Sequence, residues 1–325
     1  MVRIGLLGYG YWGAILARVI AAMPGASLAA IADVDPTRTA EARARYPHAR
    51  VTADTAELLA SDGLDAIVVA TPAATHAALA GAALAGGRHV LVEKPLALDA
   101  DEADRLVSLA RARGRVLMVD HTFVYSGAVR RLRALLDVGE LGEVLAVDAT
   151  RTSLSRFHPD IGVAWDLAVH DLAILDHLLG PPTAGPVVHT SSIEPGGRPD
   201  VAHLTLRYGA AIAHVHASWL TAVKVRRMVV TGTLATVVYD GLDLAAPLTV
   251  YEAPLPAPGD AGAATTLRTG LRAGRAWAPE VAADEPLAVM LAHFVECVST
   301  GATPRTDGAS AARVVQLLAG QAVPA

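Results

Sequence analysis

The chain has 325 residues, of which 53% are hydrophobic and 4% aromatic, and its formal net charge is -5 with a pI near 6.2. This length suits about two domains, and a weakly acidic chain without a basic stripe excludes nucleic acid as a routine partner. A single cysteine, Cys297, excludes an intrachain disulfide and fits a reducing compartment. The start runs directly into a strand pattern and no apolar stretch could span a bilayer, so we expect a cytoplasmic protein without a membrane partner.

The first 120 residues alternate apolar runs with helical patterns. The runs lie at 4–7, 28–32, 66–70, 90–92 and 116–119, and the expected helices lie at 12–22, 37–45, 75–85 and 100–113. Continuous apolar runs are typical of strands that are buried on both faces, as in a parallel sheet covered by helices. The alternation predicts an α/β fold in which residues 1–120 form a Rossmann dinucleotide-binding domain.

The pattern changes after residue 120. We expect helices at 128–138 and 165–179, strands at 143–152, 186–193, 201–208, 210–219, 225–231, 234–240 and 248–252, and closing helices near 285–299 and 308–320. Many strands with few helices between them predict an α+β domain over residues 121–325 with a largely antiparallel sheet. The closing helices are expected to pack back on the body of the protein.

A glycine motif follows the first strand. Gly8, Gly10 and Gly13 form the pattern G-x-G-x-x-G between the run at 4–7 and the helix that begins near residue 12. In this setting the glycines allow a tight turn, the close approach of a diphosphate and close packing of helix on strand. The diphosphate would bind the unpaired N–H groups and the positive end of the helix.

Asp33 lies 20 residues after Gly13, at the end of the second strand, where an acidic side chain binds the adenosine ribose. A carboxylate there repels a 2′-phosphate, which favours NAD over NADP. Asp33 could instead cap the next helix, but we assign that role to Asp35 and expect Asp33 to be free. The full set of expected cofactor contacts is Gly8, Gly10, Tyr11, Trp12, Gly13, Asp33, Thr71, Pro72, His76, Glu93 and Lys94, with His76 either touching the cofactor or capping its helix.

Lys94 is one of only two lysines, with Lys224, among 27 basic residues. A lysine in an arginine-rich chain suggests a task that arginine cannot perform, because arginine stays charged whereas a desolvated lysine can exchange a proton. The alternative is a solvated loop lysine. Lys94 ends the fifth strand, at the sheet edge where ligands bind in such folds.

Asp166 and His170 are four residues apart on a predicted helix and therefore share one face. A carboxylate–imidazole pair beside a lysine could take a proton from an alcohol while its hydride leaves. A surface ion pair is the alternative, and Asp171 is expected on the surface. The tight clustering of a zinc site is missing, so we expect no metal.

The chain resembles the Gfo/Idh/MocA oxidoreductase family over its whole length. The resemblance is carried by the glycine motif, Asp33, Thr71-Pro72, Glu93-Lys94-Pro95 and the Asp166…His170 pair. The resemblance implies a Rossmann domain, an open-faced sheet domain whose face is buried in a homodimer or homotetramer, and chemistry at Lys94 and His170. It also implies that the Lys94–Pro95 bond can be cis. Residues 121–123 and 153–171 are similar to sugar 3-dehydrogenases.

The resemblance therefore implies NAD-dependent oxidation of a secondary ring hydroxyl of a sugar, or the reverse reduction. The expected hydroxyl is the one at C3 of a hexopyranoside. A cyclitol dehydrogenase, a non-catalytic NAD sensor and an NAD-dependent glycoside hydrolase are the alternatives, and either Lys94 or His170 is the primary proton acceptor. Expected substrate contacts are His121, Tyr125, Arg151, Arg156, Trp165, Asp166 and His170. The two arginines could bind a diphosphate, or could be surface residues.

Overall fold

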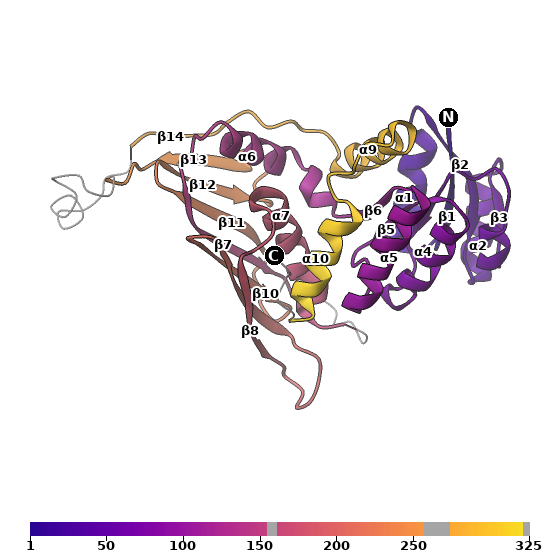
Figure 1. Cartoon of the computed structure of the whole chain (residues 1–325), viewed down its shortest axis with the longest axis horizontal. Coiled ribbons are helices and arrows are strands. Elements are labelled where there is room, and N and C mark those ends of the chain that lie inside the picture. Colours follow the sequence, from indigo (N-terminus) through magenta and orange to yellow (C-terminus); the bar gives the residue numbers. More distant parts are fainter. Residues whose placement is uncertain (155–160, 257–273, 321–325) are drawn as a thin grey trace. The chain divides into compact units, whose positions relative to one another are not determined.

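The computed structural model describes residues 1–154, 161–256 and 274–320. The chain divides into two compact units, the first formed by Met1–Tyr125 and Asp284–Ala319 and the second by Ser126–Ala283 with the C-terminal residues from Gly320. Each unit is built around its own sheet. The last two helices, α9 (Pro286–Thr300) and α10 (Gly308–Leu318), belong to the first unit (Figure 1).

The first unit contains a six-stranded, wholly parallel sheet in the order β3-β2-β1-β4-β5-β6, the doubly wound order of a Rossmann domain. Its strands are β1 (Val2–Leu7), β2 (Ala26–Ala32), β3 (Arg50–Thr52), β4 (Ala66–Val69), β5 (His89–Glu93) and β6 (Leu117–Asp120). The connecting helices are α1 (Tyr11–Ala22), α2 (Pro36–Arg45), α3 (Thr55–Leu59), η1 (Ala73–Thr75), α4 (His76–Ala85), α5 (Ala100–Arg113) and η2 (Thr122–Tyr125).

The continuous apolar runs explain this sheet. All four residues of β4 are buried, as are five of the six in β1, because helices cover both faces. The predicted Rossmann fold is thus confirmed. The short elements β3 and α3 were not predicted, because three residues carry no periodicity and α3 owes its start to the Asp54 carboxylate, which accepts from the Ala56 N–H at 2.8 Å.

The second unit contains an eight-stranded sheet in the order β14-β13-β12-β11-β7-β10-β9-β8. Its strands are β7 (Val144–Thr152), β8 (Ala184–Ser191), β9 (Val201–Tyr208), β10 (Ala211–Ser218), β11 (Val225–Gly232), β12 (Ala235–Asp240), β13 (Leu248–Glu252) and β14 (Ala276–Trp277). Within the described part of this eight-stranded sheet, only the β7–β10 pair is parallel, which confirms a largely antiparallel sheet.

The strands of this sheet alternate between a buried and an exposed face. The buried side chains include Leu204, Val215 and Val237. The helices α6 (Gly127–Asp137), η3 (Ala164–Ala168) and α7 (Val169–Leu179) lie on one face of the sheet (Figure 1). The opposite face carries polar and β-branched side chains. This is the pattern of a sheet with one face packed and one face open.

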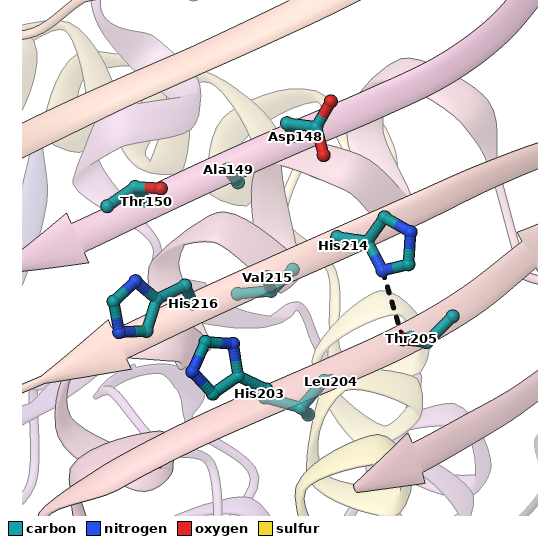
Figure 2. Close-up of a pocket in the computed structure, with 9 residues that line it drawn as sticks. All are labelled: Asp148, Ala149, Thr150, His203, Leu204, Thr205, His214, Val215 and His216. Carbon is teal, nitrogen blue, oxygen red and sulfur yellow. Dashed lines mark hydrogen bonds between the residues drawn. The ribbon is translucent and has the colours of Figure 1, made fainter. Parts of the chain in front are cut away.

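Histidines gather on the open face. His203 of β9 and His216 of β10 are cross-strand neighbours, and their rings stack with centroids 4.3 Å apart and planes 5° apart. Beside them the Thr205 hydroxyl and His214 Nδ1 lie 3.0 Å apart, and Asp148 and Thr150 complete the shallow pocket shown in Figure 2. Within the described residues, no helix is both long and apolar enough to cross a bilayer.

Candidate active site

The glycine motif forms a tight loop between β1 and α1. Gly8 has φ +92°, and a side chain there would place its Cβ 2.4 Å from the Ala70 carbonyl oxygen. A Cβ at Gly13 would lie 2.0 Å from the carbonyl oxygen of Gly8. Both positions therefore require glycine for physical reasons. The loop fits the diphosphate of a dinucleotide, because it brings the start of the helix close to the backbone of the turn.

The first turn of α1 is open to an anion. Gly10 is the N-cap and supplies no side-chain acceptor, and the first turn contains no acidic residue. Its N–H groups and the positive helix end are therefore available to a phosphate. Tyr11 and Trp12 begin the helix with exposed rings that meet edge to face, 5.8 Å between centroids. Both rings stay expected cofactor contacts.

Asp33 lies at the end of β2 but is not free, which corrects the expectation. Its Oδ2 accepts from the Tyr9 N–H at 2.6 Å, and its Oδ1 accepts from the Asp35 N–H at 2.9 Å. Arg38 Nη1 also lies 3.6 Å from Asp33 Oδ2. Asp35 caps α2 as expected, because its carboxylate accepts from the Thr37 N–H at 2.8 Å. The carboxylate of Asp33 therefore holds the glycine loop through the Tyr9 N–H.

The His76 ring is buried, which corrects the expected contact with the cofactor. The residue does end the short helix η1, where its backbone N–H donates to the Ala73 carbonyl oxygen. The ring is 1% exposed and lies with Nδ1 2.7 Å from the Pro95 carbonyl oxygen and Nε2 2.8 Å from that of Thr71. Burial lowers the pKa of His76, so the neutral ring donates to one of these two carbonyls. The ring ties the segment after β4, which includes Thr71 and Pro72, to the segment after β5.

The residues at the end of β5 form a charged cluster. The Lys94–Pro95 bond is cis, as the resemblance implied. The Lys94 N–H donates to Glu93 Oε2 at 3.1 Å, and the positive charge of Lys94 lowers the pKa of the neighbouring His121. Burial, the larger cause, and this charge together bring the pKa of His121 to about 3, so the ring is neutral. The structure thus brings together Lys94, Glu93 and His121 at the carboxyl edge of the sheet.

Tyr125 is a core residue, which corrects its assignment as a substrate contact. Its side chain is fully buried in the first unit, and the hydroxyl lies 3.0 Å from His293 Nδ1 and 3.3 Å from the Thr306 hydroxyl. Burial raises the pKa of Tyr125 to about 12. The hydroxyl is therefore neutral and joins η2 to α9, through His293, and to the segment between α9 and α10, through Thr306.

In the second unit, Asp166 and His170 lie on either side of the point where a π-helical turn becomes an α-helix. Asp166 lies in η3, a π-helical turn, and His170 lies in the first turn of α7. Single π turns occur frequently at functional sites. The indole N–H of the buried Trp219 donates to Asp166 Oδ2 at 3.1 Å and holds its carboxylate. Trp165, an expected substrate contact, is partly exposed in the same turn.

Asp171 and Arg151 form a buried ion pair, so neither is a surface residue. Arg151 Nε and Nη2 donate to the two carboxylate oxygens of Asp171, each at 2.8 Å, and the side chains are 5% and 4% exposed. The expectations that Asp171 lies on the surface and that Arg151 is open to a diphosphate were therefore wrong. Arg156 lies outside the described residues.

Sequence reasoning overlooked three residues of these clusters. Asp120 ends β6 beside Glu93, and its position at a strand end was a signal that could have been used. Trp219 lies 53 residues from Asp166, so no local pattern marked it, whereas Arg38 follows Asp33 by only five residues and could have been found. Among the described residues, no group of three or more His, Cys, Asp and Glu side chains is placed to hold a metal ion.

Comparisons with known proteins agree with this geometry. Residues 2–121 match the description "Oxidoreductase family, NAD-binding Rossmann fold", and residues 129–238 match the "GFO/IDH/MocA C-terminal domain". The uncharacterized oxidoreductase YdgJ of Escherichia coli is 34% identical over 74% of this chain and 72% of its own length. The chain belongs to the Gfo/Idh/MocA oxidoreductase family.

One relative with a named activity covers much of this Gfo/Idh/MocA oxidoreductase. UDP-N-acetylglucosamine 3-dehydrogenase of Acidithiobacillus ferrooxidans is 33% identical over 70% of each chain. Its solved structure covers 98% of this chain and 95% of that chain, with a TM-score of 0.82 and 26% identity. The family assignment confirms an enzyme with an NAD-binding Rossmann fold.

Proposed function

We propose that this oxidoreductase oxidises a secondary ring hydroxyl of a hexopyranosyl sugar, at C3, with NAD as hydride acceptor, or catalyses the reverse reduction. The observation that carries the proposal is Lys94 at the carboxyl end of β5, on the sheet edge that also holds the glycine loop. The 33% sequence identity of this chain with UDP-N-acetylglucosamine 3-dehydrogenase supports a sugar substrate, and the name of that enzyme supports oxidation at position 3. Asp33, which ends β2, supports NAD.

In the proposed reaction, three side chains have separate roles. His170 takes the hydroxyl proton, and Lys94 donates a hydrogen bond to the reacting oxygen and stabilises the developing alkoxide. Asp166, which is itself held by Trp219, orients His170 or binds a neighbouring hydroxyl. NAD supplies the acceptor for the hydride that leaves the carbon.

The reaction is tested by incubating the enzyme and NAD with a panel of sugars and monitoring the formation of NADH. The panel contains free, nucleotide-linked and glycosidic sugars as well as inositols. Accumulation of NADH with a hexopyranoside supports the proposal, whereas accumulation with inositols alone shows a cyclitol dehydrogenase. Release of a glycosyl group without NADH shows a hydrolase. Tight NAD binding without turnover of any sugar shows a sensor.

Replacement of Lys94 by Ala tests the catalytic group. Turnover should fall by about 10² to 10⁴, the contribution of one positioned proton-transfer or charge-stabilising group, while NAD binding stays nearly intact. The matched control is Lys224→Ala, since Lys224 is the second lysine of the chain and is exposed. If Lys94→Ala retains more than about a tenth of the activity, the role is wrong.

For the assembly, we propose that a second copy of the chain covers the open sheet face in a dimer or tetramer. The partly exposed Val229 of β11 and Val238 of β12 are cross-strand neighbours, and exposed apolar side chains favour burial. Val229→Arg should reduce the mass measured by light scattering to that of a monomer. Val138→Arg, at an exposed position after α6, is the control and should leave the mass unchanged. A wild-type monomer would contradict the proposal.

A further inference from the structure

A pocket of about 400 Å³ lies in the first unit, where β5 and β6 begin. It is lined by His89, the first residue of β5, by the end of α5 and by the turn between α9 and α10. All strands of this sheet are parallel, so the pocket lies at the edge opposite to the one that carries the glycine loop and Lys94. Its volume is within the range of small-molecule pockets, roughly 300–1,000 Å³.

Two arginines give this pocket a positive charge. Arg111 lies in the last turn of α5, and Arg115 follows Gly114, whose left-handed conformation ends the helix. In the described part of the chain, neither guanidinium forms an ion pair with a carboxylate. Asp307 also lines the pocket, but its carboxylate accepts from the Ser310 N–H at 2.8 Å and caps α10. Two positive charges and one negative charge therefore line the pocket.

The hydrogen bonds of His89 show which ring nitrogen carries the hydrogen. The Val116 N–H donates to His89 Nδ1 at 3.0 Å, and the Val116 carbonyl oxygen accepts from the Val90 N–H, so the sheet holds this residue in place. Burial, and then the charge of Arg115, lower the pKa of His89, although Asp65 acts to raise it, and the ring is neutral. A neutral imidazole has one acceptor nitrogen and one N–H group. Since Nδ1 accepts, Nε2 carries the hydrogen.

Arg115 and His89 place two donors side by side. Arg115 Nη1 lies 3.3 Å from His89 Nε2. A guanidinium has donors only, and Nε2 already carries its hydrogen, so neither group can accept from the other. The opposite tautomer would bring the Val116 N–H against a second N–H at Nδ1 instead. The pair therefore needs an acceptor from outside the ring, and a negatively charged oxygen could accept from both groups.

A phosphate group matches these donors better than a carboxylate does. A phosphomonoester has three terminal oxygens and a charge of about -1.5 to -2 at neutral pH. Its oxygens can accept from Arg111, Arg115 and His89 together, and arginine suits phosphate because its planar fork donates two parallel hydrogen bonds. The buried Ala110 and Leu117 form an apolar part of the wall. The pocket therefore has room for a carbon chain beside the phosphate.

We propose that this pocket binds the phosphate group of a small phosphorylated metabolite through Arg111, Arg115 and the Nε2–H group of His89. This site goes beyond the proposed dehydrogenase reaction. The five residues of β5 separate His89 from Glu93 by about 13 Å, at about 3.3 Å per residue. The bound molecule is therefore a separate ligand and not the molecule that is oxidised beside Lys94.

The hydrogen on the His89 ring can be observed directly. The full chain is labelled with ¹⁵N-histidine, and the His89 signals are those that His89→Gln removes. Near pH 8, Nε2 should give the signal of a nitrogen that carries hydrogen and Nδ1 that of a nitrogen without one. This measurement uses the unaltered protein. A hydrogen on Nδ1 would overturn the proposal, because Nε2 would then accept from Arg115.

The same signals measure binding of inorganic phosphate, added in the presence of saturating NAD so that the glycine loop is occupied. The His89 Nε2 signal should move to a plateau, whereas that of the exposed His189 in the second unit should stay in place. Arg111→Gln and Arg115→Gln should each raise the phosphate concentration at half-saturation about tenfold, the effect of losing one charge-assisted hydrogen bond. Arg113→Gln is the matched control and should change nothing, because Arg113 is exposed at the same helix end but does not line the pocket.

Two further probes test the chemical class of the ligand. Glycerol 3-phosphate should bind at least as tightly as inorganic phosphate, and acetate should bind more weakly than either. A His89 signal that phosphate leaves in place would overturn the site, as would an equal loss in Arg113→Gln and Arg111→Gln. Acetate binding as tight as that of phosphate would overturn the choice of phosphate, and weaker binding of glycerol 3-phosphate would overturn the organic ligand. These titrations require no turnover, so failure of the site and failure of the proposed reaction are separate results.

Discussion

The buried pair of Arg151 and Asp171 should be a main source of stability in the second unit. Asp171→Asn keeps the size of the side chain but removes the charge, which leaves a buried guanidinium without its counter-ion. Removal of one partner from a buried pair costs about 3–5 kcal/mol. The amide oxygen of Asn can still accept one of the two 2.8 Å hydrogen bonds, so we expect a loss near the lower limit, about 3 kcal/mol.

Urea and thermal unfolding followed by circular dichroism measure this loss. For a unit of this size about 3 kcal/mol corresponds to a fall in Tm of about 6–12 °C. The matched control is Asp137→Asn, which breaks a similar two-pronged contact with Arg133 on the surface of α6, where the side chains are 51% and 41% exposed. An exposed pair contributes at most about 1 kcal/mol, because solvent screens it.

The reasoning also predicts a compensating change. The double variant Arg151→Met/Asp171→Leu removes both buried charges and should recover most of the lost free energy of unfolding, because apolar side chains of similar volume need no counter-ion. The burial argument would be refuted if Asp171→Asn cost no more than Asp137→Asn. It would also be refuted if the double variant were less stable than Asp171→Asn alone.

Three further predictions concern the first unit. Gly13→Ala should weaken NAD binding at least about tenfold by calorimetry, because the new Cβ would lie 2.0 Å from the Gly8 carbonyl oxygen and force the loop open. Asp33→Ser should raise the affinity for NADP relative to NAD by about tenfold or more, because it removes the repulsion of a 2′-phosphate and releases Arg38, 3.6 Å away, to bind it. His121 should destabilise the protein in acid, because its ring takes up a proton near pH 6.5 in the unfolded chain and only near pH 3 in the folded protein. The stabilising free energy from the neutral ring is therefore fully present above pH 6.5 and is lost as the pH falls from 6.5 to 3. His121→Gln should therefore reduce the slope of unfolding free energy against pH by about 1.4 kcal/mol per unit in that window.

Controls separate these effects from general damage. Gly81→Ala in α4 places its Cβ 3.7 Å from Leu106, an ordinary contact, and should leave NAD binding unchanged. Equal loss in Gly81→Ala and Gly13→Ala would contradict the role of the loop. An unchanged cofactor preference in Asp33→Ser would show that Arg38 cannot reach a phosphate. A His121→Gln variant with the wild-type pH slope would contradict the neutral state of this ring.

Much of the fold followed from short-range patterns. The five predicted strands of the first unit, from 4–7 to 116–119, all appear with boundaries within about three residues, because buried parallel strands need continuous apolar runs. The glycine loop was equally clear, since Gly8 and Gly13 are required by contacts within a few residues and with the next strand. Asp35 was correctly separated from Asp33 because helix capping is a local interaction.

The errors concern polar side chains whose partners are distant in sequence. Asp171 is next to His170 and looked like a surface residue, but Arg151 on β7 brings it into the interior. Tyr125 and His76 were assigned to ligands, yet each is buried against a group that no local pattern reveals, at His293 and at Pro95. A polar residue can be buried only where partners satisfy it, and those partners are chosen by the fold.

By itself the amino-acid sequence determined most of the strands and helices and the glycine loop, because periodicity, glycine geometry and capping act over a few neighbouring residues. Tertiary structure alone decided which acids and bases are charged. The carboxyl of Glu93 meets that of Asp120 only when β5 and β6 align in register. Charge state depends on burial and on the nearest other charges, and both are properties of the folded arrangement.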